Sequence, residues 1–290
     1  MAGQPRTAVS GKIILRLQQG RTTMPLFQSP LLRAVVRFLA SVCAVLLATT
    51  AAAATPEVLL KGEFKDDIAQ RVLACTGCHG PQGRAAPDGY YPRLAGKPAG
   101  YLYNQLINFR DGKRQYGLMT QLIAPLTDAY LMEIAQHFSS LQAPYPAPSA
   151  RTQSAEQRAR GNQLILLGEP ARGIPACVQC HGAAMTGVAP NVPGLLGLPR
   201  DYLNAQLGAW KTGQRRAHGP DCMAAIVKLL SSDDINAASS YLSALKLPLD
   251  TKPASSAPQL QTGAKGTVPM QCGSAPLNAH AHANAGKSKP

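Results

Sequence analysis

Apolar side chains recur every three to four positions along three stretches of the first half of the chain, at 68–73, 101–109 and 131–141. This spacing places them on one face of a helix and predicts three short amphipathic helices. Asp66 and Asp67 precede the first helix, where carboxylates interact favourably with the helix dipole, and Thr127 is suited to cap the third. A loop rich in Gly and Pro, from 80 to 100, separates the first two helices.

The second half repeats this pattern, which predicts an internal duplication. Pro193-Gly194-Leu195 matches Pro92-Arg93-Leu94 at an offset of 101 residues. The same offset relates an aromatic residue, a glycine and an arginine in each half, which are Phe109, Gly112 and Arg114 and then Trp210, Gly213 and Arg215. We therefore expect an all-α protein with two tandem helical domains, 56–145 and 155–248, joined by a Pro-rich linker at 146–154.

The two ends of the chain differ from these domains. Arg33 and Arg37 precede an apolar run from 38 to 47 and an Ala-rich stretch that ends near Ala54, an order typical of a secretory signal peptide. The run is short for a membrane span. Residues 1–54 are therefore expected to be a leader that directs the mature protein to the periplasm. Translation is expected to start at Met24, which N-terminal sequencing of the precursor would test. Residues 249–290 are of low complexity, and we expect them to be disordered.

The formal net charge of +14 lies mainly outside the two predicted domains. Residues 1–54 contain six Lys or Arg and no acid, and residues 251–290 contain four and no acid, so the remainder carries 19 minus 15, or +4. This nearly neutral body does not indicate nucleic-acid binding. The basic tail is suited to weak association with an acidic partner or an anionic membrane surface.

A Cys-x-x-Cys-His motif occurs once in each half, with its thiols and imidazole at Cys75, Cys78 and His79 and at Cys177, Cys180 and His181. Two thiols on one helical turn can form thioethers to one porphyrin, and the adjacent imidazole can then bind the iron. A zinc knuckle or a thioredoxin-like pair is the alternative. The histidine after each second cysteine, the repetition and the export signal favour two covalently bound haem c groups.

Two methionines are candidates for the sixth iron ligands. Met119 and Met223 correspond at an offset of 104, whereas Met132 aligns with Asn236 and is expected to pack in the core. A thioether suits an electron-transfer haem because it fills the sixth position and stabilises ferrous iron. His218 lies close to Met223 in sequence and is a competing ligand.

Four further residues are candidates for contacts with the haem groups. The carbonyls of Pro92 and Pro193 are expected to accept the free N–H of the proximal imidazoles, or else these prolines serve only as turns. Arg114 and Arg215 are expected to bind haem propionates, with a solvated surface position as the alternative.

The repeated motifs resemble those of periplasmic dihaem cytochromes c of the cytochrome c4 group, over roughly 63–247. The resemblance implies two class I cytochrome c domains, each wrapped around one haem. It implies a monomeric electron carrier, not an enzyme, that works between a respiratory donor and a terminal oxidase or another acceptor. Two alternatives are the cytochrome subunit of a dehydrogenase complex and a dihaem oxidoreductase or peroxidase with one open haem.

The second half departs from the family pattern. It inserts residues 168–176 before its haem motif. Cys222 and Cys272 are left over after the haems have taken four cysteines, and an oxidising periplasm favours a disulfide between them. The alternative is a Cys222 thiolate bound to iron, which is similar to the ligand that thiosulfate dehydrogenases use.

Overall fold

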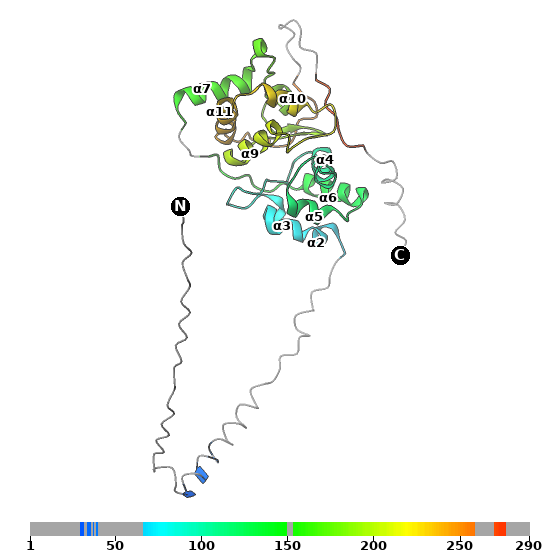
Figure 1. Ribbon diagram of the computed structural model, residues 1–290, viewed down its shortest axis with the longest axis vertical. Helices are drawn as coiled ribbons and strands as arrows, with labels where there is room; N and C mark the ends of the chain where they lie inside the picture. The colour runs from blue at the N-terminus through cyan, green and yellow to red at the C-terminus, as the bar shows by residue number, and fades with distance from the viewer. Residues whose placement is uncertain are drawn as a thin grey trace, which may run out of the picture. The chain divides into compact units, whose positions relative to one another are not determined.

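The computed structural model describes residues 66–149, 153–258 and 270–276, with six positions between 30 and 39. The chain divides into two compact units, 1–63 and 64–290. The expected signal peptide, its cleavage near Ala54 and the start at Met24 lie outside the described residues. None of the helices in the described part is long and apolar enough to cross a membrane. The second unit consists of two helical halves (Figure 1).

The first half is built from helices that pack around one apolar core. They are α2 (Ile68–Arg71), α3 (Leu73–His79), the 3-10 turn η3 (Pro81–Gly83), α4 (Ala99–Arg110), α5 (Gly117–Ile123) and α6 (Asp128–Ser140). Leu131 and Phe138 of α6 are fully buried against α4. Asp67 caps α2 and Thr127 caps α6 through side-chain hydrogen bonds, so the three predicted helices are confirmed. The sequence did not predict α5.

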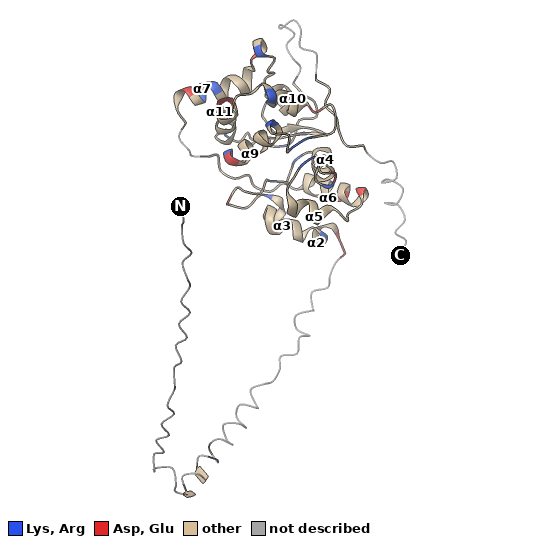
Figure 2. Ribbon diagram, in the orientation of Figure 1, with Lys and Arg blue, Asp and Glu red and all other residues tan. Residues whose placement is uncertain are grey.

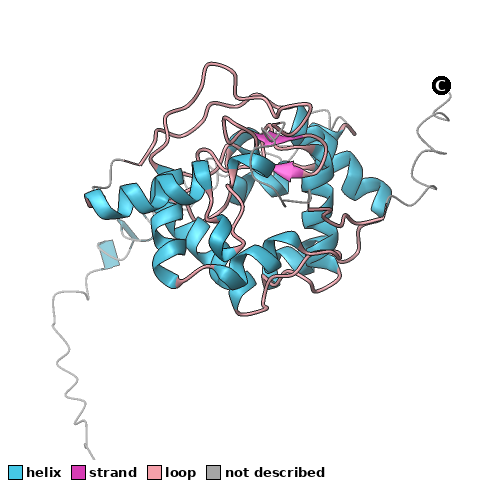
Figure 3. Cartoon of the chain, turned by 90° about the horizontal axis from the view of Figure 1, so that it is seen from above, coloured by secondary structure: helices cyan, strands magenta, loops and turns pink. Residues whose placement is uncertain are grey.

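The second half repeats this arrangement with additions. Its elements are α7 (Ala155–Asn162), the π-helical turn η4 (Gln163–Leu167), the 3-10 turn η5 (Pro170–Arg172), α8 (Val178–His181), β1 (Gly187–Val188), β2 (Val192–Pro193), α9 (Arg200–Lys211), α10 (Cys222–Leu229) and α11 (Ser232–Ser243). The two strands form an antiparallel hairpin among the helices (Figure 3). Helix α11 packs on α7 and α9, around a second core that includes Leu164, Ile165 and Val227.

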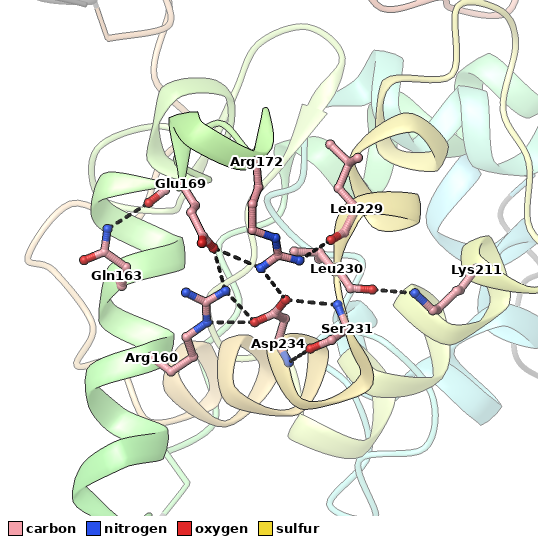
Figure 4. A network of polar contacts seen from close by, with 10 residues as sticks. Arg160, Gln163, Glu169, Arg172, Lys211, Leu229, Leu230, Ser231 and Asp234 are labelled. Carbon is pink, nitrogen blue, oxygen red and sulfur yellow. Dashed lines mark hydrogen bonds and ion pairs between the residues drawn. The ribbon is translucent and has the colours of Figure 1, made fainter.

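The insertion at 168–176 is held by charged side chains (Figure 4). Arg160 bonds Glu169 and Asp234, each at 2.7 Å, and Arg172 bonds Asp234 at 3.1 Å. Asp234 is 4% exposed and also accepts the N–H of Ser231 at the start of α11. Burial raises the pKa of this carboxyl, but the Ser231 hydrogen bond and the two guanidinium groups lower it overall, to about 2. The insertion is therefore fixed against α7 and α11.

The end of the first predicted domain, at 143–145, and Ser149 of the predicted linker hold this part of the chain against both halves. Arg93, only 2% exposed, donates hydrogen bonds to the carbonyls of Ala143 and Pro144. Its guanidinium stacks 3.9 Å from the centre of the Tyr145 ring, which packs against the core of the second half. Ser149 donates its N–H to the carbonyl of Ser243 at 2.8 Å. The described part of this segment is thus extended and anchored.

Two parts of the C-terminal tail make specific contacts in the structure, whereas the sequence predicted that the tail is disordered. Cys272 forms a disulfide with Cys222, as predicted. Beyond it, Ala275 is buried in the core of the first half and donates its N–H to Asn104 of α4 at 2.8 Å. Ala254 pairs with Val188 in an isolated β-bridge. The disulfide and the burial of Ala275 fix this segment in place, although its composition carries no helical or strand pattern.

The disulfide is expected to stabilise the folded chain. Replacing both Cys222 and Cys272 by Ser removes a link across 50 residues, and should lower the free energy of unfolding by about 2–4 kcal/mol. Denaturant unfolding followed by circular dichroism measures this loss. Cys272→Ser alone controls for the free thiol at 222. An unchanged unfolding free energy would show that the bond contributes nothing.

Asp234→Asn should destabilise the protein by about 2 kcal/mol at pH 7, because the folded carboxyl titrates near pH 2 instead of 3.8. The depressed pKa means that this stability is complete above about pH 4 and is lost as the pH falls through 2. Asp233→Asn is the matched control, because Asp233 directly precedes Asp234 on α11 and is exposed. Equal unfolding free energies of the two variants at pH 7 would contradict the expectation.

Candidate functional site

The first Cys-x-x-Cys-His motif forms α3, and His79 is its last residue. Gly80 follows at φ +74°, and a Cβ there would lie 2.5 Å from the carbonyl oxygen of Ala85, so the chain can turn away here only at a glycine. His79 is 7% exposed, and its Nδ1 lies 2.8 Å from the carbonyl oxygen of Pro92. Burial lowers the pKa of this imidazole and favours its neutral form. A neutral ring that donates from Nδ1 keeps the lone pair of Nε2 for a metal.

The second motif has the same geometry. His181 ends α8, is 7% exposed and has its Nδ1 at 2.8 Å from the carbonyl oxygen of Pro193. Gly182 follows at φ +86°, and the β1–β2 hairpin presents Pro193 to the ring. Burial lowers the pKa of His181 as well. The predicted pairing of each histidine with a proline carbonyl is therefore confirmed in both halves.

None of the four motif cysteines forms a disulfide, so all four sulfurs are available for haem attachment. Cys78 is exposed and the other three are half-buried. Among the described residues, no group of three or more His, Cys, Asp or Glu side chains could hold a metal ion, whereas structural zinc sites use four ligands.

Each candidate methionine lies on a short helix in the same half as its histidine. Met119 belongs to α5, is half-buried and packs against the first core. Met223 follows Cys222 in the first turn of α10 and packs against the second core. Asp221 caps α10 by accepting the N–H of Ala224 at 3.0 Å, so the disulfide and the cap both fix this turn.

The remaining candidates near the haem motifs have different surroundings. Met132 packs against the first core, as expected. His218 lies beneath the tail segment at Gly273, and its Nε2 is buried without a hydrogen-bond partner among the described residues. Its role as a competing ligand stays a prediction.

Arg114 and Arg215 meet where the two halves touch. Their backbones form an antiparallel bridge, and their side chains are 9% and 5% exposed. Each guanidinium bonds a glutamine from both halves: Arg114 donates to Gln105 at 3.2 Å and to Gln206 at 2.8 Å, and Arg215 donates to the same two oxygens at 2.9 and 2.8 Å. Sequence reasoning missed these glutamines, although they recur at the same offset as the arginines.

This contact is rich in donors and lacks an anion. Burial and the neighbouring Arg114 lower the pKa of Arg215 to about 10. Neither arginine forms an ion pair with a carboxylate in the part of the chain that the structure describes. Arg215 stacks on Trp210, whose buried Nε1 also lacks a partner there. The propionates of a haem would supply carboxylates to these guanidinium groups, so the residues fit the group, and burial excludes the solvated surface position.

The chain is similar in sequence to two named proteins. No family model matches it. It is 36% identical to the thiosulfate dehydrogenase electron acceptor of Stutzerimonas stutzeri (strain A1501), over 70% of this chain and 92% of that protein. It is 34% identical to cytochrome c4 of Pseudomonas aeruginosa, over 60% of this chain and 85% of that protein.

Solved structures give the same result. Reduced recombinant cytochrome c4 from Pseudomonas stutzeri matches with a TM-score of 0.52 and 30% identity, over 61% of this chain and 95% of that chain. The thiosulfate dehydrogenase TsdBA from Marichromatium purpuratum matches with a TM-score of 0.53 and 33% identity, and this chain covers only 36% of it. Together with the paired histidine motifs and the anion-free arginine contact, these similarities show that the chain belongs to the cytochrome c4 family of dihaem electron carriers, with covalently bound haem c.

Proposed function

We propose two equivalent haem sites, each with two thioether bonds, a proximal histidine and an axial methionine. Their residues are Cys75, Cys78, His79 and Met119 in the first site, and Cys177, Cys180, His181 and Met223 in the second. The observation that carries this proposal is the hydrogen bond of each histidine Nδ1 to a proline carbonyl, 2.8 Å in both halves. Separate apolar cores support domains over 56–145 and 155–248.

The bound haem supplies a one-electron couple between ferrous and ferric iron. The residues of the chain restrict it to that role. Met119 and Met223 would hold the iron at its sixth position in each half, which would leave no iron position open to a substrate. The proline carbonyls hold the imidazoles in one tautomer and orientation. Arg114 and Arg215, which lie at the contact between the halves, would hold the propionates by charge-assisted hydrogen bonds.

We infer that the physiological donor is a thiosulfate dehydrogenase, and that the electrons pass on to a terminal oxidase or another respiratory acceptor. The relative in Stutzerimonas stutzeri is named as the electron acceptor of such an enzyme. The periplasm is the proposed compartment, because residues 33–54 have the pattern of a signal peptide and a disulfide suits an oxidising environment.

A second candidate function is that of a cytochrome subunit within a dehydrogenase complex. The similarity to part of the longer TsdBA chain favours it, because there the matched region is joined to other sequence. Co-purification of a dehydrogenase with this protein at physiological salt supports a subunit, and a freely diffusing cytochrome supports a carrier. Acidic and basic residues both occur on the helices of the two halves (Figure 2).

Single substitutions test the methionine ligands. Met119→Ala and Met223→Ala should each remove about half of the far-red iron–thioether absorption and allow carbon monoxide to bind one of the two haems, because each opens one sixth position. Optical spectra of the haem-loaded protein measure both effects. Met132→Ala is the control and should change neither. Carbon monoxide binding to the unsubstituted protein would refute two filled sites.

Kinetics with a purified thiosulfate dehydrogenase test the donor. Thiosulfate should reduce both haems only when that enzyme is present, at a rate that falls with salt if charge steers the encounter. Replacing Lys265, Lys287 and Lys289 of the basic tail by Gln, with the disulfide left intact, measures any tail contribution to docking on the enzyme or on anionic vesicles. An enzyme that reduces this protein no faster than an unrelated monohaem cytochrome argues for a different donor.

A further inference from the structure

Lys97 extends from the first half into the haem-binding loop of the second. Its Nζ donates a hydrogen bond to the carbonyl oxygen of Gly194 at 2.7 Å, and the residue is 5% exposed. Gly194 directly follows Pro193, whose carbonyl oxygen accepts the Nδ1–H of His181. The lysine therefore lies beside the peptide that orients the proximal imidazole of the second haem.

No anion balances this ammonium group. Lys97 forms no ion pair with any described residue, and the charged or titratable groups that face it are Arg93 and His181. Burial and the positive charge of Arg93 lower the pKa of Lys97 to about 7. Its charge in turn acts together with burial to lower the pKa of His181. Lys97 thus acts electrostatically on the proximal side of the second site.

The first site has a different cation, because Arg114 acts together with burial to lower the pKa of His79. At the repeat offset of 101, Lys97 corresponds to Leu198 and Arg93 corresponds to Gly194. Leu198 is 6% exposed and belongs to the second core, so it brings no charge toward the Pro92 loop. Lys97 is therefore a buried cation beside the second proximal loop, and no lysine takes its place at the repeat offset in the first site.

We propose that Lys97 raises the reduction potential of the second haem relative to the first, and so biases the electron of the half-reduced protein toward the second haem. A nearby positive charge favours ferrous over ferric iron, because reduction lowers the charge of the centre by one. The hydrogen bond acts in the same direction, since a cation beside the Pro193 carbonyl reduces the electron density that His181 can donate to iron. The proposal rests on His181 as the proximal ligand.

Redox titration of the haem-loaded protein at pH 6, with each haem followed by its own methyl NMR signals, tests the role of Lys97. Lys97→Met removes the charge and should lower the ratio of reduced second haem to reduced first haem about tenfold, which is about 59 mV for a one-electron couple. Lys97→Arg should restore most of the ratio. The control is Lys252→Met, which removes an exposed lysine of the C-terminal tail. A ratio that changes less than twofold in Lys97→Met overturns the proposal.

Three further readouts separate charge from structure. Lys97→Gln keeps a hydrogen-bond donor without a charge, so it should shift the ratio as Lys97→Met does if the charge is what acts. It also takes the place of Lys97→Met in the test if the Lys97→Met protein does not fold. An equal shift of both haems, with a lower unfolding midpoint, would instead show that Lys97 only holds the halves together. Absence of the iron–thioether band or of the proximal imidazole signals from the unsubstituted protein would refute the ligand assignment itself. Intact bands with an unchanged ratio would refute only the role of Lys97.

Discussion

Two guanidinium groups buried side by side at the contact between the halves are the constraint on which the rest of the structure depends. Removing two like charges from water is costly, and two glutamine oxygens with a tyrosine hydroxyl satisfy their hydrogen bonds without neutralising them. Haem propionates bound at this contact would supply carboxylates, which the described residues around the two guanidinium groups do not. Haem binding would then offset part of the cost of burying both arginines where the halves meet.

The local framework follows from short-range signals in the sequence. Thr127 caps α6 because its hydroxyl is followed by an amphipathic run, and the glycine after each motif histidine allows the backbone to turn where a side chain would clash. The Cys222–Cys272 bond followed from counting thiols after haem attachment. The proline carbonyls followed from the rule that a ligating imidazole has a partner on its other nitrogen.

The long-range contacts could not be predicted in the same way. Arginine and lysine are rarely buried, so nothing in the sequence indicated that Arg93 and Lys97 lie inside. The sequence singled out Arg114 and Arg215, but not their contact with each other. Ala275 belongs to a segment with no periodic pattern, and the disulfide and a hydrogen bond to Asn104 hold it at the first core. The repeat showed that the halves are alike, but not which surfaces meet or where their equivalence is broken.

The contact between the halves has the symmetry of a two-fold dimer. Gln206 bonds Arg114 just as Gln105 bonds Arg215, so one surface patch meets its own copy. Such a self-complementary patch is what joins identical subunits in a dimer. Here the linker turns association into an intramolecular event with an effective concentration in the millimolar range. Two separate half-molecules would come apart on dilution, whereas in a single chain the two redox centres stay paired however scarce the protein is.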